Sequence, residues 1–182
     1  MQKKSFLTYL FRFFLLFSLL YFGTKAMIGI TVPGGYYSPF IDQHLNYIAG
    51  LRWLLLNASK GLLNLFGYAT YFKDSYTIKM QLGRGVKVVY SCLGYGLFSF
   101  WIAFIFANNP AVKKMLLWMV GGVLIIFLLN VCRIAIMLIA VNKHWPSLFN
   151  LDNHTLFNIA AYAVIFIMIY FFDRAGKKQA ML

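Results

Sequence analysis

The sequence predicts an all-α integral membrane protein with about four transmembrane helices, an extracytoplasmic amphipathic helix and a small β-hairpin. Of its 182 residues, 62% are hydrophobic and only 12% are charged. A soluble domain of this length could not bury so much apolar surface. The apolar residues also gather in runs long enough to cross a bilayer. We therefore expect residues 1–182 to form a single membrane domain.

The first predicted span covers residues 9–30. It follows a basic N-terminus, as the apolar part of a signal peptide would. However, the apolar run is about 20 residues long, the length of a full span. It is also not followed by the small-residue cleavage site of a signal peptide. These features favour a helix that is retained.

Residues 31–90 are predicted to form an extracytoplasmic insert. A turn-rich linker, "VPGGYYSP", leads into a helical pattern over residues 41–68 that contains Asp42, His44, Arg52 and Lys60. Ionisable groups are costly against lipid, so this pattern indicates an amphipathic helix or helix pair lying on the membrane. A fifth span remains the alternative. In "YTIKMQLGRGVKVVY", side chains alternate on both sides of a glycine turn, which is typical of a β-hairpin.

Three further spans follow the insert, at residues 92–107, 115–141 and 155–172. The first of these is short. With four spans, the basic residues near the N-terminus, in the "NNPAVKK" loop and after the last span all fall on one side of the membrane. The positive-inside rule places that side in the cytoplasm. We therefore expect a multi-pass protein of the bacterial inner (plasma) membrane with both termini cytoplasmic.

The chain is strongly basic, with 17 Lys and Arg against 4 Asp and no Glu and a formal charge of +13. In a soluble protein this balance would suggest a nucleic-acid partner. Beside membrane spans, the cations are better explained by contact with anionic lipid head groups. Membrane lipids are therefore expected partners, and nucleic acid is not.

Cys92, Arg133 and His154 are chemically notable because each is costly where it lies: Cys92 opens the second predicted span, Arg133 lies inside the third, and His154 opens the fourth. A helix over residues 115–141 is about 40 Å long at about 1.5 Å per residue, longer than a hydrocarbon core of about 30 Å. Arg133 should therefore lie near the outer boundary, at the depth of Cys92 and His154. Each residue also has an ordinary explanation: a small buried thiol, a snorkelling cation and a helix cap.

Together the three residues suit acyl transfer. A guanidinium and a helix N-terminus both favour a thiolate at Cys92. A neutral imidazole at His154 could take the thiol proton and return it to a leaving amine. Arg133 could instead face a developing oxyanion.

Three nearby residues could support this chemistry. Gly94 leaves room beside the sulfur for a peptide, as does Gly96. Asn130 lies three residues before Arg133, on the same helix face. Asn158 lies four residues after His154 and could orient its ring.

This set of residues resembles the exosortase/archaeosortase family of membrane transpeptidases. The resemblance is carried by "SCLG", "NVCR" and "DNHTLFN", in this order and at these span positions, and it covers residues 41–172. The chain is similar to the short members of that family. It has Asn158 where the long members often have glycine.

The resemblance implies a membrane cysteine protease and transpeptidase. Its substrates would be exported proteins with a C-terminal sorting signal, made of a short motif, a membrane span and a basic tail. Cys92 would be the nucleophile, His154 the acid and base, and Arg133 the stabiliser of the thiolate or oxyanion. The thioester would pass to a surface anchor, and neither a metal nor an organic cofactor would be needed.

Other functions remain open from the sequence. A non-catalytic assembly factor or transporter subunit would use Cys92 for packing and Arg133 as an anchor. A thiol oxidoreductase would pair Cys92 with Cys132, but the chain has no C-x-x-C motif, and we expect Cys132 to be a packing residue. A disulfide between the two cysteines is also possible. His144 competes with His154 for the catalytic role, and His44 is a more remote candidate.

Overall fold

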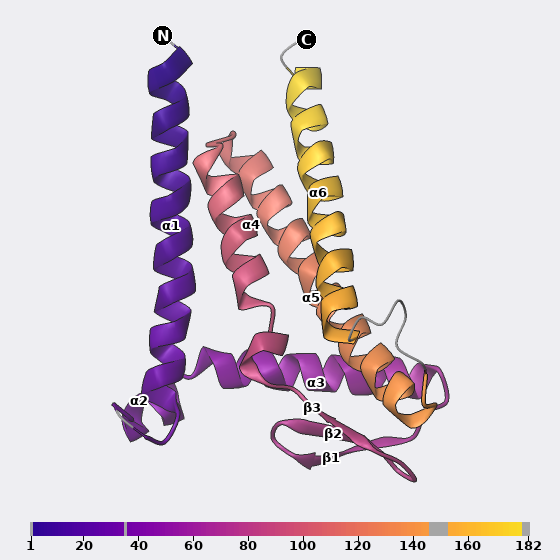
Figure 1. The fold of residues 1–182 in the computed structure, drawn as a ribbon. Coiled ribbons are helices and arrows are strands. Elements are labelled where there is room, and N and C mark those ends of the chain that lie inside the picture. Colours follow the sequence, from indigo (N-terminus) through magenta and orange to yellow (C-terminus); the bar gives the residue numbers. More distant parts are fainter. Residues whose placement is uncertain (1, 35, 146–152, 180–182) are drawn as a thin grey trace.

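The fold consists of long helices with a small sheet gathered at one end (Figure 1). A computed structural model describes residues 2–34, 36–145 and 153–179; the side chains of residues 2–5, 153–154 and 176–179 lie outside the description. The first turn of α1, the connection between α4 and α5, and the last turns of α6 lie at one end. We call the opposite end, formed by α2, α3 and the sheet, the sheet end.

Three of the described helices are long and apolar enough to cross a membrane. They are α1 (Gln2–Thr31), α5 (Val112–Asn142) and α6 (Asn153–Gln179). A fourth, α4 (Tyr95–Ala107), is equally apolar but has only 13 residues. At about 1.5 Å per residue, it is shorter than the hydrocarbon core. The predicted class, an all-α membrane protein with about four spans, is confirmed, with the second span short.

The span helices pack mainly through aromatic side chains. Phe13 on α1 meets Phe100 on α4 edge to face, with ring centroids 5.5 Å apart. Trp101 is fully buried between α4 and α5, and its indole N–H donates to the Trp118 carbonyl at 2.9 Å. Phe172 brings α6 against both helices through edge contacts that include Trp118. These contacts bury the aromatic surface and satisfy the indole N–H inside an apolar region.

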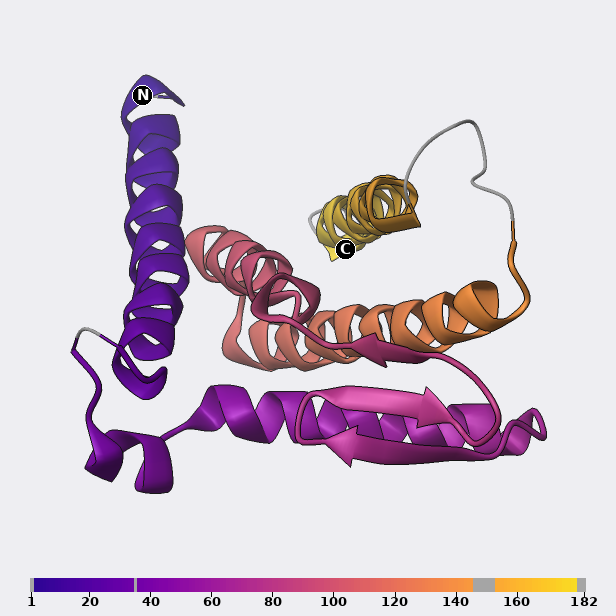
Figure 2. The same ribbon diagram turned by 60° about the horizontal axis from the view of Figure 1, so that its bottom comes forward.

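The predicted helix over residues 41–68 is a helix pair. It consists of α2 (Pro39–His44) and α3 (Tyr47–Leu65), and α3 begins where the Asn46 side chain accepts a hydrogen bond from the Ala49 N–H at 2.9 Å. Figure 1 shows α3 lying crosswise to α1 at the sheet end, and Figure 2 shows it running alongside α5. Its apolar face packs on α5, which is why this charged helix is not arranged as a further span.

The sheet has one strand more than the predicted hairpin. The hairpin itself is β2 (Thr77–Met80) and β3 (Gly85–Lys87), and β1 (Thr70–Asp74) pairs with the other side of β2, so all neighbours are antiparallel. The Asp74 carboxylate accepts a hydrogen bond from the Tyr76 N–H at 2.8 Å and closes the turn between β1 and β2. An Asx turn of this kind depends on one side chain, which explains why the strand pattern alone did not reveal β1.

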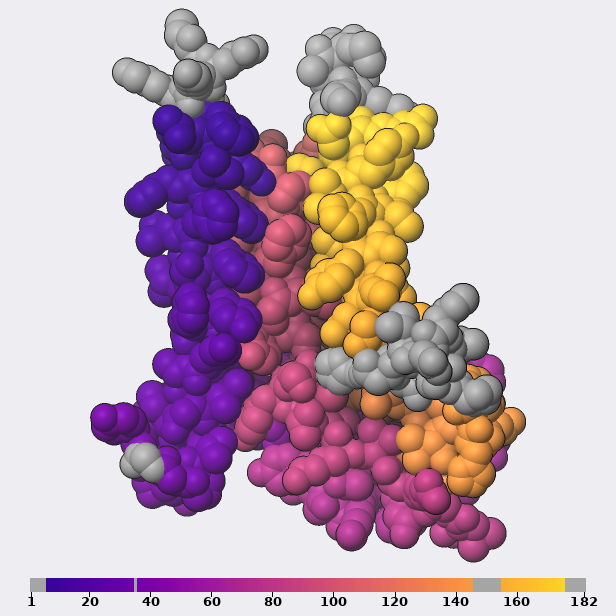
Figure 3. Space-filling view, in the orientation of Figure 1, coloured from indigo at the N-terminus to yellow at the C-terminus, as the bar shows by residue number. Residues whose placement is uncertain are grey.

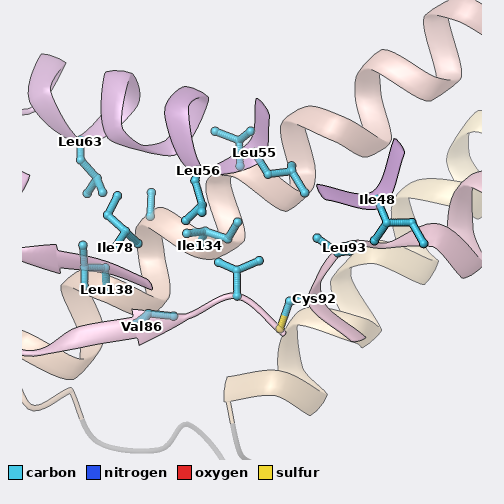
Figure 4. Close-up of a cluster of buried hydrophobic side chains, with 13 residues drawn as sticks. Ile48, Leu55, Leu56, Leu63, Ile78, Val86, Cys92, Leu93, Ile134 and Leu138 are labelled. Carbon is cyan, nitrogen blue, oxygen red and sulfur yellow. The ribbon is translucent and has the colours of Figure 1, made fainter. Parts of the chain in front are cut away.

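The main core lies where the sheet, α3 and α5 meet (Figure 4). Its fully buried members include Leu55 and Leu63 from α3, Ile78 from β2 and Leu138 from α5. The chain passes from β3 through this core into α4. The segment that carries Cys92 is therefore anchored on both sides by packed structure.

The second predicted span, residues 92–107, begins too early. The helix starts at Tyr95, and Cys92 lies before it in a 3₁₀ turn, η1 (Tyr90–Cys92). The residue between them, Gly94, has φ +73°, in the left-handed region. A left-handed residue cannot continue a right-handed helix, so the turn and the helix remain separate elements.

Candidate active site

Cys92 is held in a tight turn. Its N–H donates to the Val89 carbonyl at 2.9 Å, and the next N–H, of Leu93, donates to the Tyr90 carbonyl at 3.1 Å. The Cys92 side chain is 7% exposed and belongs to the main core. Figure 4 draws it at the edge of that core, with the sulfur pointing away from Leu93. The thiol is therefore covered by packed side chains but lies at the boundary of the main core.

The two cysteines do not pair. Both are free, with Cys92 buried and Cys132 exposed. The expectation that Cys132 is a packing residue is therefore wrong. Neighbouring residues of a helix point about 100° apart, so burying Arg133 turns Cys132 outward.

Gly94 and Asn130 interlock α4 with α5. A Cβ atom at Gly94 would collide with the Asn130 carboxamide, so only glycine permits this approach. Asn130 is 1% exposed and donates from Nδ2 to the Ile126 carbonyl at 3.1 Å, while its Oδ1 is buried without a hydrogen-bond partner. This contact fixes the position of the Cys92 turn relative to α5.

Arg133 lies one helical turn beyond Asn130 and is also buried, at 3% exposure. Its guanidinium carbon is 4.8 Å from the centre of the Phe157 ring on α6. Both Nε and Nη2 are buried without a hydrogen-bond partner. These two nitrogens form one edge of the guanidinium, from which two N–H groups can donate to an anion.

A cavity of about 880 Å³ opens between α1, α4, α5 and α6. Figure 3 shows a furrow between α1 and α6, with α4 at its floor. We call it the intramembrane cavity. Four predicted site residues line it, namely Gly94, Asn130, Arg133 and Asn158. Most of the remaining lining is apolar, contributed by Phe17, Tyr21, Leu97, Phe100, Phe157, Ala161, Tyr162, Ile165, Phe166 and Ile169.

Cys92 reaches this cavity only indirectly. Its neighbour Ser91 lines the wall, whereas Cys92 itself does not. His154 lies in the first turn of α6, and its side chain is outside the description. Phe157, one turn further along α6, contacts Arg133, so α6 brings its N-terminal part to the cavity wall.

The other two histidines do not line the intramembrane cavity. His44 lies on α2, where its Nδ1 is 3.1 Å from the Phe40 carbonyl oxygen, and His144 is exposed after the end of α5. Within the described ranges, no group of three or more His, Cys, Asp or Glu side chains could hold a metal ion.

The sequence pattern missed several residues of the wall. Phe157 is one of them, and the signal that could have found it is its place three residues after His154, on the same helix face. The contribution of Phe17 and Tyr21 from α1 could not be found, because local pattern does not specify which helices are neighbours.

The fold and this cavity define a polytopic membrane protein with a polar cluster, including one buried arginine, at the sheet end of its span helices. The sequence model of the transmembrane exosortase family matches residues 2–171. The chain therefore belongs to the transmembrane exosortase family. Exosortases as a class are peptidases or transpeptidases that process exported proteins carrying sorting signals. No curated protein and no solved structure matches the chain.

Proposed function

We propose that this exosortase is a cysteine transpeptidase that cleaves the C-terminal sorting signal of exported proteins and transfers them to a surface anchor. The observation that carries the proposal is the buried, unpartnered edge of Arg133 in a cavity beside the Cys92 turn. A buried cation without an anionic partner is costly, and proteins retain such groups mainly where they bind or react.

In the proposed first step, the Cys92 thiolate attacks the carbonyl carbon of the scissile peptide bond. A C–S bond forms, the C–N bond breaks, and the substrate is held as a thioester. His154 takes the thiol proton and gives it to the leaving amine. The Nε and Nη2 edge of Arg133 stabilises the negative oxygen of the intermediate. This electrostatic stabilisation is stronger in a site that contains little water.

The intramembrane cavity would receive the membrane span of the sorting signal. Its lining is mainly aromatic and aliphatic, and its opening lies between α1 and α6, helices that are apolar enough to face lipid. A helix could then enter from the bilayer without passing through water. The polar group formed by Asn130, Arg133 and Asn158 would lie beside the peptide bond at the end of that helix.

The proposal includes an orientation: a multi-pass protein of the bacterial inner membrane, with both termini in the cytoplasm and the sheet end outside. Figure 1 supports this orientation, because the N-terminal end of α1, the C-terminal end of α6 and the α4–α5 connection lie at the same end of the molecule. The basic residues Lys113, Lys114 and Arg174 lie at this end. Exported substrates would meet the site on the outer face.

Replacing the nucleophile tests the chemistry. Cys92→Ala is expected to abolish cleavage of a co-expressed exported protein that carries a C-terminal sorting signal. The matched control is Cys132→Ala, since Cys132 is the other free cysteine and is exposed. The measurement is the mass of the exported protein, together with the membrane level of each variant.

Unchanged cleavage by Cys92→Ala at normal membrane levels would contradict the enzyme proposal. It would favour the alternative, a non-catalytic assembly factor or transporter subunit in which Cys92 only packs. A positive result is strengthened if wild-type protein, quenched with acid, yields a Cys92 peptide carrying the mass of a thioester-linked substrate fragment.

A further inference from the structure

A second cavity, also of about 880 Å³, lies at the sheet end. We call it the outer cavity. It is enclosed by the end of α1, by α2, by the first half of α3, by the β1–β2 turn and by Tyr90. Because Tyr90 lines the outer cavity and Ser91 lines the intramembrane cavity, the turn that carries Cys92 lies between the two.

Arg52 is the buried charge of the outer cavity, at 4% exposure. Its guanidinium is stacked between two tyrosine rings, 4.3 Å from the centre of Tyr76 and 4.6 Å from that of Tyr90. A cation over the face of an aromatic ring is attracted by the ring, but this contact does not give its N–H donors a hydrogen-bond acceptor. Nε and Nη2 are both buried without a hydrogen-bond partner.

The free edge of Arg52 matches the two oxygens of a carboxylate or phosphate group. The rest of the lining distinguishes these ligands. Asp42 lies in the wall, where its carboxylate accepts hydrogen bonds from the Tyr37 hydroxyl at 3.0 Å and the Asn46 amide at 2.7 Å. Asp74 also lies in the wall, and the hydrogen bond from the Tyr76 N–H lowers its pKa.

The described wall therefore carries one guanidinium and two carboxylates. A dianionic phosphate would bind Arg52 against repulsion from both aspartates. A ligand with one carboxylate and one ammonium group would find a partner for each charge. Neither aspartate occupies the Nε and Nη2 edge of Arg52, so these buried donors have no partner among the described residues.

We propose that the outer cavity binds the acceptor of the transfer reaction, and that this acceptor is an amine that also carries a carboxylate group. The inference rests on the proposed function. The donor protein would fill the intramembrane cavity, so the thioester on Cys92 could be approached only from the other side of its turn. The outer cavity lies on that side, and Arg52 holds the acceptor by its carboxylate.

The proposed step is aminolysis of the thioester. As the acceptor leaves the aspartates, its ammonium group gives one proton to water at the outer face, and the free amine nitrogen then attacks the thioester carbonyl carbon. A C–N bond forms, the C–S bond breaks, and the Cys92 sulfur leaves with the electron pair. The nitrogen loses one proton, which passes through His154 to the sulfur, so the thiol is restored and no oxidant or reductant is needed.

The test compares two small amines that differ in the carboxylate. Glycine and glycinamide are supplied together to wild-type protein and to Arg52→Gln in membranes with an exported substrate, and the two adducts on the released substrate are measured by mass. The ratio of glycine to glycinamide adduct is expected to fall about tenfold in Arg52→Gln, the effect of losing a charge-assisted hydrogen-bonded pair. Comparing ratios removes the intrinsic difference in reactivity between the amines.

Two further variants make the test specific. Lys87→Gln removes a cation from β3 that is exposed and lines neither cavity, and it should leave the ratio at the wild-type value. Arg52→Lys keeps the charge but lacks the two-pronged edge, and it should give an intermediate ratio. Because Lys can still stack on the tyrosines, this variant also covers the case in which Arg52→Gln fails to fold.

The outcomes separate the two proposals. An unchanged ratio in both Arg52 variants would show that Arg52 only clamps α3 to Tyr76 and Tyr90, and would overturn the acceptor site. If the Arg52 variants lost the glycine adduct and the glycinamide adduct equally, the acceptor site would likewise be overturned. A wild-type protein that cleaves no sorting signal would instead contradict the proposed function, and the acceptor site would fall with it.

Discussion

The two buried arginines, Arg52 and Arg133, are alike at the level of single side chains. Each stacks on aromatic rings, and each leaves Nε and Nη2 buried without a partner. A guanidinium held over a ring face keeps its N–H donors for an anion, which suits the anion-binding roles proposed for both residues. Cys92 belongs to η1, the turn in which Tyr90 lines the outer cavity and Ser91 lines the intramembrane cavity.

Gly94 gives a prediction at this scale. Gly94→Ala should lose most cleavage and destabilise the protein by at least about 1 kcal/mol, because alanine is strained at φ +73°. The new Cβ would also collide with Asn130 and displace the Cys92 turn. The readouts are the thermal unfolding midpoint in detergent and the cleavage of an exported substrate.

The matched control for that prediction is Gly96→Ala. A Cβ at Gly96 would meet only the Tyr21 ring, at an ordinary distance of 3.6 Å, and the backbone is not left-handed there. This variant should retain its stability. Equal behaviour of the two alanine variants would show that the glycine conformation does not position the turn.

At the scale of elements, the short helix α4 is the centre of the packing. It touches α1 along one side through aromatic rings and α5 along the other. Because 13 residues cannot span the hydrocarbon alone, α4 depends on these neighbours for its place. The Cys92 turn is attached to its first residue and takes its position from this packing.

The adjacent glycines of α5 test this packing. Gly122→Ala should destabilise the protein by about 1–3 kcal/mol, because its Cβ would collide with the buried Trp101 indole and break the hydrogen bond to Trp118. Gly121→Ala is the control, since its Cβ would meet no atom within 4 Å. Both are measured by thermal unfolding in detergent. An equal midpoint for the two variants would contradict the described α4–α5 interface.

At the scale of the whole molecule, the two ends differ in composition, and this difference supports the proposed orientation in the membrane. One end has only helix termini and a short connection with lysines, and the other has α3 packed crosswise with the sheet. The intramembrane cavity runs between the span helices, while the outer cavity belongs to the sheet end. The proposed reaction thus brings together a donor from the bilayer and an acceptor from the outer face.

Cysteine labelling tests this orientation. In a background with Cys132→Ala, a cysteine placed at Lys79 on β2 should react with a membrane-impermeant maleimide added to intact cells. A cysteine at Lys113, in the first turn of α5, should react only after the membrane is opened. Lys79 is half-buried and Lys113 is exposed, so the labelling of each cysteine is compared with its own labelling after the membrane is opened. The reverse pattern would place the candidate site in the cytoplasm and contradict the proposed function.

Much of the fold could be predicted from local sequence. Hydropathy alone located the three long helices, because the membrane imposes the same length and polarity on every span. The β2–β3 hairpin followed from alternation around a glycine turn. The strand β1 and the later start of the second span, at Tyr95, did not, since they depend on the Asp74 turn and the left-handed Gly94.

The candidate site, like the fold, could be predicted from the sequence only in part. The sequence by itself determined which reactive groups are present and at which span ends they fall, namely Cys92, Arg133 and His154, because order and depth follow from helix rise and bilayer thickness. Only the tertiary structure decided which side chains meet. Gly94 against Asn130, Arg133 over Phe157, and Arg52 between two tyrosines join residues from separate elements. Such contacts depend on side-chain packing between elements, which no local pattern encodes.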